Sequence, residues 1–135
     1  MQPDQEITLL LQKAGLRPTA QRLALARVLF DGSDKHVSAE SLHEGVNAAG
    51  GRVSLATVYN TLHQFKAAGL LREVAIEGDR SFYDTNTSNH FHLYDVEEGT
   101  LLDVDHEQLK ISGLPALPKG QVIDRVDVIV RVKRR

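Results

Sequence analysis

The sequence of 135 residues contains no cysteine and no tryptophan, and aromatic residues make up only 5% of it. The absence of cysteine excludes disulfides, thiolate metal sites and cysteine nucleophiles, so any metal must be held by nitrogen and oxygen atoms. No stretch approaches the roughly 20 consecutive apolar residues that a membrane-spanning helix needs. Residues 1–6 also lack the basic start of a signal peptide. We therefore expect a cytoplasmic protein with no membrane partner.

An excess of positive charge is also missing, since the formal net charge is -2. Affinity for DNA phosphates rests on lysine and arginine, so the overall balance argues against nucleic acid. The charges are unevenly distributed, however, because residues 7–30 and 45–72 contain basic side chains and no acidic ones. A solvated helix face would give the same pattern, and charge alone does not decide for DNA binding.

The apolar pattern of the first half predicts four helices, over residues 6–14, 19–30, 39–48 and 54–69. Thr19, Ser38 and Ser54 each stand where a helix needs an N-cap. Residues 70–76 and 80–84 flank Glu77-Gly78-Asp79 and are expected to pair as a hairpin. Helices followed by a hairpin predict a winged helix-turn-helix domain.

The second half is expected to contain strands over residues 90–96, 100–104 and 122–133, with a short helical segment near Glu107. The valines of the last strand leave an apolar face that a segment of about 50 residues struggles to cover alone. A homodimer would cover it and would place two reading helices in major grooves about 34 Å apart. The expected fold class is α+β, with an N-terminal winged helix-turn-helix over residues 1–84 and a small α/β dimerisation domain over residues 85–135.

The helix that begins at Ser54 carries large apolar residues on one side and small or hydrogen-bonding residues on the other. Small Ala56 permits close approach to DNA, and Thr57 can bond a phosphate. Tyr59, Asn60 and His63 can reach base edges or thymine methyl groups. Periodicity alone fits an ordinary amphipathic helix with an uncharged surface equally well.

His90 and His92 are expected to lie on the same face of a strand, because strand side chains alternate with a period of two. Asp84 ends the wing, Asp103 lies on the next strand, and His36 is placed in the loop before the third helix. Three imidazoles and two carboxylates suit Fe²⁺, Mn²⁺ or Zn²⁺. A lone His-x-His pair is more often a surface feature than a ligand pair, and carboxylates near hairpins are commonly solvated.

Residues 16–22 (LRPTAQR) and residues 57–70, with TVY, Leu62, Phe65 and AGL, resemble the ferric uptake regulator family over nearly the whole chain. The string VSLATVYNTLHQF is similar to the iron response regulator branch in particular. The resemblance implies a DNA-binding homodimer in which Arg17 reaches the minor groove of an A/T-rich palindromic operator while Tyr59 contacts bases. Arg22 and Ser54 join the expected DNA-binding set. Asn60 stands where many relatives carry arginine, so the base preference should differ.

The resemblance also implies that His36, Asp84, His90, His92 and Asp103 hold a regulatory metal. Ligands from both domains would then clamp them together and change operator affinity. The sign of this response stays open, since iron response regulators are implied to act under iron limitation and to lose DNA binding on haem.

Three histidines, His43, His63 and His106, are expected to lie outside the metal site. Asp95 and Glu98 stand where many relatives have a Cys-x-x-Cys for structural zinc, so that site is absent. Some members of the iron response branch carry a Cys-Pro haem motif and three consecutive histidines, which this chain lacks. If haem is the ligand instead, a histidine would have to bind its iron, and histidine is an ordinary axial ligand of haem iron.

The expected function is therefore a metal- or haem-responsive transcription regulator, such as a repressor, that controls iron homeostasis and is not an enzyme. Within this class the alternatives are a manganese- or zinc-responsive regulator and a peroxide sensor. A non-haem iron enzyme could use two histidines and a carboxylate, but it needs an enclosed substrate pocket that the small second half has little volume to form. A winged-helix protein-interaction module with an incidental histidine cluster is a further interpretation.

Overall fold

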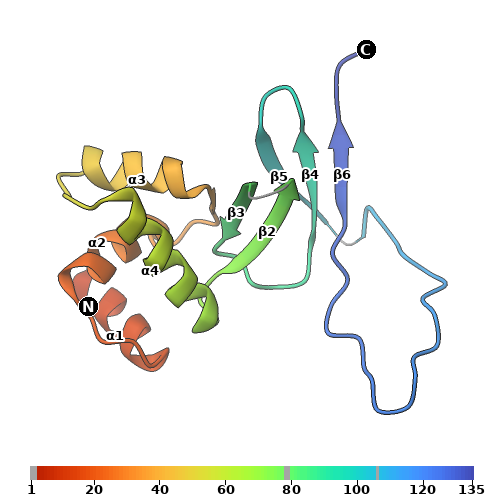
Figure 1. The fold of residues 1–135 in the computed structure, drawn as a ribbon, viewed down its shortest axis with the longest axis horizontal. Coiled ribbons are helices and arrows are strands. Elements are labelled where there is room, and N and C mark those ends of the chain that lie inside the picture. Colours follow the sequence, from red (N-terminus) through yellow and green to blue (C-terminus); the bar gives the residue numbers. More distant parts are fainter. Residues whose placement is uncertain (1–2, 78–79, 106) are drawn as a thin grey trace. The chain divides into compact units, whose positions relative to one another are not determined.

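The computed structural model describes residues 3–77, 80–105 and 107–135 (Figure 1). The chain divides into two compact units, unit 1 over residues 1–87 and unit 2 over residues 88–135. Residues 1–2, 78–79 and 106 lie outside the described residues. Two expectations fall there, the wing turn at Gly78 and Asp79 and the exclusion of His106 from the metal site.

Unit 1 begins with the expected helices, α1 (Pro3–Lys13), α2 (Ala20–Leu29), α3 (Ala39–Ala48) and α4 (Leu55–Ala67). The expected N-caps are confirmed for α2, α3 and α4. Thr19, Ser38 and Ser54 each accept a hydrogen bond from the backbone N–H three residues further on. Ser38 and Ser41 form a capping box at α3, since the Ser41 hydroxyl oxygen accepts a hydrogen bond from the backbone N–H of Ser38.

The helices of unit 1 pack around one apolar core. On α4, Val58, Leu62 and Phe65 are fully buried, and the Phe65 ring lies 5.9 Å from the ring of Phe30. Burial of this side leaves the opposite side of α4 exposed to solvent. The buried cluster consists of Ile7, Leu11, Leu25, Ala26, Leu29, Ala39, Leu42, Val46, Val58, Leu62, Phe65, Leu71 and Tyr83.

A small antiparallel sheet completes unit 1, formed by β1 (His36–Val37), β2 (Arg72–Glu77) and β3 (Arg80–Asp84) in the order β1-β3-β2. The expected hairpin is therefore confirmed as the β2–β3 pair. His36 was expected in a loop, but it lies on β1 and pairs with Asp84 across the sheet. Two residues are too short to leave a periodic pattern, which explains why the sequence did not predict this strand.

Unit 2 is built on a three-stranded sheet of β4 (Phe91–Asp95), β5 (Thr100–Val104) and β6 (Ile129–Val132), in the order β5-β4-β6. β4 pairs antiparallel with β5 and parallel with β6. The turn between β4 and β5 is closed by the Asp95 carboxylate, which accepts hydrogen bonds from the backbone N–H groups of Glu97 and Glu98.

Two expectations for unit 2 were wrong. The strand expected over residues 122–133 is confined to Ile129–Val132, because β4 offers a paired partner only to those residues. The helical segment expected near Glu107 is a turn, in which the backbone N–H of Gln108 bonds to the Asp105 carbonyl oxygen. Gly113, with a φ of +78°, and the prolines that follow it do not suit a helix there.

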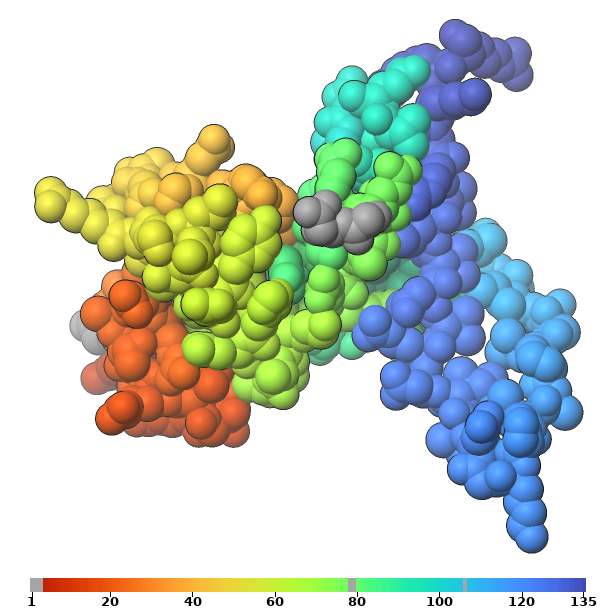
Figure 2. Space-filling model, viewed as in Figure 1, coloured from red at the N-terminus to blue at the C-terminus, as the bar shows by residue number. Residues whose placement is uncertain are grey.

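The segment between β5 and β6 carries exposed apolar side chains. Figure 2 shows this segment, in light to mid blue, extending beyond the sheet of its own unit. Leu114 is 50% exposed, Leu117 is 40% exposed and Val122 is 88% exposed in the single chain. No helix in the described part of the chain is long and apolar enough to cross a membrane.

Candidate functional site

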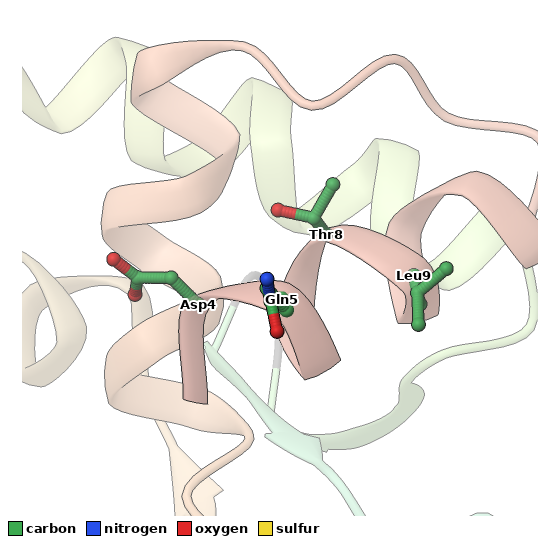
Figure 3. Close-up of a pocket in the computed structure, with 4 residues that line it drawn as sticks. All are labelled: Asp4, Gln5, Thr8 and Leu9. Carbon is green, nitrogen blue, oxygen red and sulfur yellow. The ribbon is translucent and has the colours of Figure 1, made fainter. Parts of the chain in front are cut away.

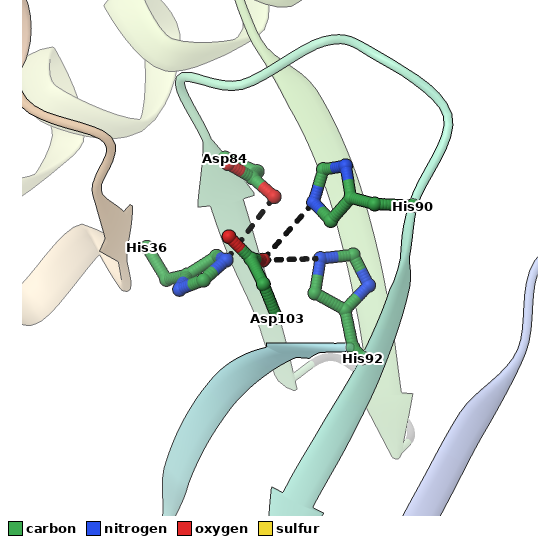
Figure 4. Close-up of side chains that lie close together, drawn as sticks. All are labelled: His36, Asp84, His90, His92 and Asp103. Carbon is green, nitrogen blue, oxygen red and sulfur yellow. Dashed lines mark ion pairs between the residues drawn. The ribbon is translucent and has the colours of Figure 1, made fainter. Parts of the chain in front are cut away.

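The first candidate ligand pair, His36 and Asp84, belongs to unit 1 and is positioned by the β1–β3 pairing. His36 Nε2 lies 3.2 Å from Asp84 Oδ2 (Figure 4). The Asp84 side chain is fully buried, and its Oδ1 accepts a hydrogen bond from the backbone N–H of Asn86. Burial of a carboxylate is unfavourable unless hydrogen bonds or a positive charge compensate, and the Asn86 N–H group and the His36 imidazole both lie beside this one.

The second candidate set, His90, His92 and Asp103, belongs to unit 2. His92 and Asp103 face each other across the β4–β5 pair, and His90 lies one residue before β4. His90 Nε2 lies 3.1 Å and His92 Nε2 lies 3.7 Å from Asp103 Oδ1 (Figure 4). Both imidazoles are buried, and both point to the same carboxylate oxygen, so the expected same-face arrangement is present.

The hydrogen bonds of His90 identify what its Nε2 can bind. His90 Nδ1 lies 2.7 Å from the carbonyl oxygen of Ser88, which can only accept, so Nδ1 carries the hydrogen. In a neutral imidazole the Nε2 lone pair would then face the negative Asp103 oxygen. This contact is favourable only when a proton or a metal ion lies between the two atoms.

The spacing of the ligand atoms suits a metal ion. Ligand atoms about 2.1 Å from a divalent ion and at right angles to each other lie about 3 Å apart. The separations of 3.2 Å in the first set and 3.1 Å in the second are close to this value. Within each set the ligand atoms lie within 4.8 Å of one another. The donors are imidazole nitrogens and carboxylate oxygens, which suit Fe²⁺, Mn²⁺ or Zn²⁺.

Other histidines of unit 1 have different surroundings. His43 Nε2, on α3, lies 3.0 Å from Asn47 Nδ2 of the same helix and 3.0 Å from the Val53 carbonyl oxygen in the connection to α4. The His63 ring lies on the exposed side of α4, 6.4 Å from the ring of Tyr83. Neither histidine therefore joins His36 and Asp84.

An arginine interacts with the acidic residues where relatives are expected to hold structural zinc. Arg134 Nη1 lies 2.7 Å from Asp95 Oδ2, and its Nη2 lies 3.3 Å from Glu98 Oε1. The backbone N–H of Glu98, and then the Arg134 guanidinium, hold the pKa of Asp95 below its ordinary value. The Asp95 carboxylate therefore stays ionised at neutral pH, with a guanidinium beside it.

The candidate DNA-reading surface is the exposed side of α4. Ala56, Tyr59, Asn60 and His63 are exposed there. Exposed Ser54 begins this surface, and it has the expected cap role, because its hydroxyl oxygen caps α4 and its hydroxyl group also donates to Thr57 Oγ1 over 3.0 Å. Ser54 therefore holds the start of this surface in place.

The two arginines assigned to DNA have different surroundings. Arg17 is exposed in the connection between α1 and α2. Arg22 is half-buried, and its guanidinium donates to Gln64 Oε1 over 3.2 Å and to the Arg17 carbonyl oxygen over 2.9 Å. Arg22 therefore links the connection that carries Arg17 to α4. Gln64 was not predicted from the sequence, since a contact between residues 42 positions apart leaves no local pattern.

A shallow pocket lies on α1, lined by Asp4, Gln5, Thr8 and Leu9 (Figure 3). The Asp4 carboxylate already accepts a hydrogen bond of 2.8 Å from Arg27 Nε. Asp4 is the one titratable side chain of this lining, so the pocket offers no metal ligand set.

Comparisons with known proteins give a consistent result. The sequence profile of the ferric uptake regulator family matches residues 13–119. The peroxide-responsive repressor PerR of Staphylococcus epidermidis is 35% identical over 99 residues, which is 73% of this chain and 65% of the relative. The match thus spans slightly less than two thirds of that relative's length.

Solved structures agree with the sequence comparison. The ferric uptake regulator of Pseudomonas aeruginosa with manganese is 26% identical with a TM-score of 0.70, over 95% of this chain and 97% of that one. The Vibrio cholerae ferric uptake regulator has a TM-score of 0.74 at 24% identity, over 94% of this chain and 98% of that one, which supports the fold. These proteins are named as regulators and a repressor rather than as enzymes. The chain belongs to the ferric uptake regulator family.

Proposed function

We propose that this protein is a metal-responsive, DNA-binding transcription regulator. The observation that carries the proposal is the approach of imidazole nitrogens to carboxylate oxygens, at 3.2 Å for His36 and Asp84 and at 3.1 Å for His90 and Asp103. This spacing suits ligands that share a divalent ion. The exposed, uncharged side of α4 supplies the surface for DNA.

One ion shared by both ligand sets is the simplest arrangement. His36 and Asp84 offer two ligand atoms, and neither this pair nor the set around Asp103 completes the coordination of a transition metal. Asp84 and His90 are six positions apart, so the chain between them reaches at most about 20 Å. We therefore propose that His36, Asp84, His90, His92 and Asp103 hold the same ion.

The ligands' positions in the chain suggest how loading affects DNA binding. When bound, the ion supplies positive charge to carboxylates from both units. His36 and Asp84 belong to the sheet of the winged-helix unit, while His90, His92 and Asp103 belong to unit 2. Shared ligation would restrict movement of one unit against the other. The arrangement that the loaded protein prefers would then set the operator affinity.

The proposed DNA partner is an A/T-rich palindromic operator read by a homodimer. Tyr59, Asn60 and His63 can contact base edges or thymine methyl groups, and exposed Arg17 can enter a narrow minor groove. Two-fold symmetry would pair two α4 helices with successive major grooves. The exposed apolar side chains between β5 and β6 are the surface that a second copy would cover, as expected for a cytoplasmic dimer.

Iron response is the finer assignment that we propose, with peroxide sensing as the second candidate. The string over residues 53–65 supports the iron response branch. The name of the Staphylococcus epidermidis relative, at 35% identity, supports peroxide sensing. The structure of the Pseudomonas aeruginosa relative was solved with manganese, which supports a manganese response for this protein.

Haem and enzyme activity have weaker support. Haem sensing rests on the iron response resemblance and would use histidine as the axial ligand. A non-haem iron enzyme would need a substrate pocket beside the ligands, and the pocket on α1 is lined by none of them. Oxygen consumption with a 2-oxo acid would support the enzyme interpretation.

The test is fluorescence anisotropy of an A/T-rich palindromic duplex against the full chain at fixed salt. The metal-free protein is compared with protein given Mn²⁺, Fe²⁺, Zn²⁺ or haem. A sharp change in affinity with one ligand would support the proposal and give the sign of the response. The His90→Ala, His92→Ala double variant should lose that change, whereas His43→Ala should retain it. Absence of operator binding under every condition would favour a protein-interaction module.

A further inference from the structure

A carboxylate lies beside the tyrosine to which the proposed function gives base contact. Glu40 is the second residue of α3, Tyr59 lies on the exposed side of α4, and both belong to unit 1. The Tyr59 hydroxyl donates a hydrogen bond of 2.8 Å to Glu40 Oε1. Phosphates repel carboxylates, so an acidic side chain next to a DNA-reading group is unfavourable unless it has a role there.

The bond limits what Tyr59 can offer to DNA. A phenol has one hydroxyl hydrogen, and Glu40 accepts it, so Tyr59 no longer has a donor for DNA and contacts a base mainly through its ring. A bond to an ionised carboxylate is stronger than one between neutral groups. The hydrogen bond from Tyr59 is the largest cause that lowers the pKa of Glu40 below 4.5, so the carboxylate is ionised at neutral pH.

The held ring and the freed hydroxyl would behave differently on DNA. An aromatic ring that is fixed at both ends fits the apolar methyl group of thymine, which is specific to one base. A released hydroxyl could instead donate to any phosphate oxygen, and phosphate contacts carry no sequence information.

We propose that Glu40 is a positioning residue that sets the sequence selectivity of DNA binding by holding the Tyr59 hydroxyl away from the DNA. The inference rests on the proposed function, because it assigns a role to Glu40 in the same interface.

The experiment selects duplexes from a random-sequence pool with the full chain in the presence of Mn²⁺. The affinities of the selected duplex and of a scrambled duplex are then compared at one salt concentration. Glu40→Ala should lower the affinity ratio about tenfold, and Glu40→Gln, which keeps an acceptor oxygen, should restore part of it. Glu44→Ala is the matched control, because Glu44 is an exposed acid on the same helix, and it should leave the ratio unchanged.

A double-mutant cycle separates positioning from a general loss of structure. In a Tyr59→Phe background there is no hydroxyl for Glu40 to hold, so Glu40→Ala should reduce the ratio much less than in the wild type. A readout without DNA follows the Glu40 carboxyl by NMR. Its titration should move to higher pH in Tyr59→Phe, because the bond that favours the ionised form is lost.

Equal ratios for the wild type and Glu40→Ala would overturn this inference while the proposed function stands. An unchanged Glu40 titration in Tyr59→Phe would also overturn it, since the two side chains would not be bonded in solution. Failure of the wild type to enrich any duplex would overturn the proposed function, and this inference with it.

Discussion

At the scale of single residues, the contacts of His90 are the most informative feature of the molecule. His90 Nδ1 donates its hydrogen to the Ser88 carbonyl oxygen, so the Nε2 lone pair of a neutral ring would face the Asp103 carboxylate. A proton or a metal ion between these two atoms makes the contact favourable. The sequence indicates that these residue types lie near one another. It does not indicate which imidazole nitrogen is turned towards the carboxylate.

Asp103→Asn should weaken Mn²⁺ binding by at least about tenfold, because the amide removes the negative ligand that two imidazoles face. Asp105→Asn, two residues further on and also exposed, is the control and should bind Mn²⁺ normally. Calorimetric titration of both metal-free variants measures the effect. Equal Mn²⁺ affinities would mean that Asp103 is not a ligand.

Glu73 gives a prediction for acid stability. The hydrogen bond from Lys66 is the largest cause that lowers the pKa of Glu73 below 4.5. A carboxyl with a lowered folded-state pKa stabilises the fold above its ordinary pKa and loses this effect as the pH falls through the lowered value. Glu73→Gln should therefore melt below the wild type at pH 7, and the difference should vanish in strong acid. A difference in Tm that persists in acid would contradict this role.

At the scale of elements, the residues that begin α4 decide how it is presented. Ser54 was expected both to cap α4 and to contact DNA, and the structure confirms the cap. A contact with DNA and a role as a cap can be separated by mutation, because aspartate is a good cap but is repelled by phosphates.

Ser54→Ala should destabilise the protein by about 1 kcal/mol, since the backbone N–H of Thr57 loses its acceptor. Ser54→Asp should restore the stability and still weaken operator binding, because it adds a negative charge at the end of α4 that we propose lies against DNA. Urea denaturation and anisotropy are measured on the same samples. Normal operator binding by Ser54→Asp would place the start of α4 away from the DNA.

Gly51, between α3 and α4, is required by close packing. A Cβ atom there would lie 2.7 Å from Val46 Cγ1 and 2.9 Å from the Val46 carbonyl oxygen. Gly51→Ala should therefore destabilise the fold by about 1–3 kcal/mol. Gly45→Ala is the matched control within α3, where the nearest side-chain atom is 3.7 Å away, and it should stabilise the fold by about 0.5–1 kcal/mol. Denaturation midpoints that move in the same direction for both variants would contradict the packing argument.

At the scale of the whole molecule, the proposed regulation depends on two units that share one ion. The ligand sets are contributed by separate sheets, β1–β3 in unit 1 and β4–β5 in unit 2. Sharing predicts that loss of ligands from either unit has the same effect on metal response.

His36→Ala and His92→Ala should each abolish the protection from hydrogen exchange that Mn²⁺ gives to residues 85–89, which connect the ligand sets. Protons compete with metal for imidazole nitrogens, so the protection in the wild type should fade as the pH drops. Hydrogen-exchange mass spectrometry of the full chain measures both effects. Protection that survives in His36→Ala would mean that unit 2 binds the ion alone.

The sequence by itself determined the four helices, their caps, the hairpin and the side of α4 that is exposed, because these follow from local spacing and from capping chemistry. It failed for β1 and for the length of β6, because strands are decided by which backbone partner is available. Only the tertiary structure decided the pairing of His36 with Asp84, the bridge from Arg22 to Gln64 and the bond from Tyr59 to Glu40. Each of these contacts joins residues far apart in the chain, and only folding brings such side chains within bonding distance.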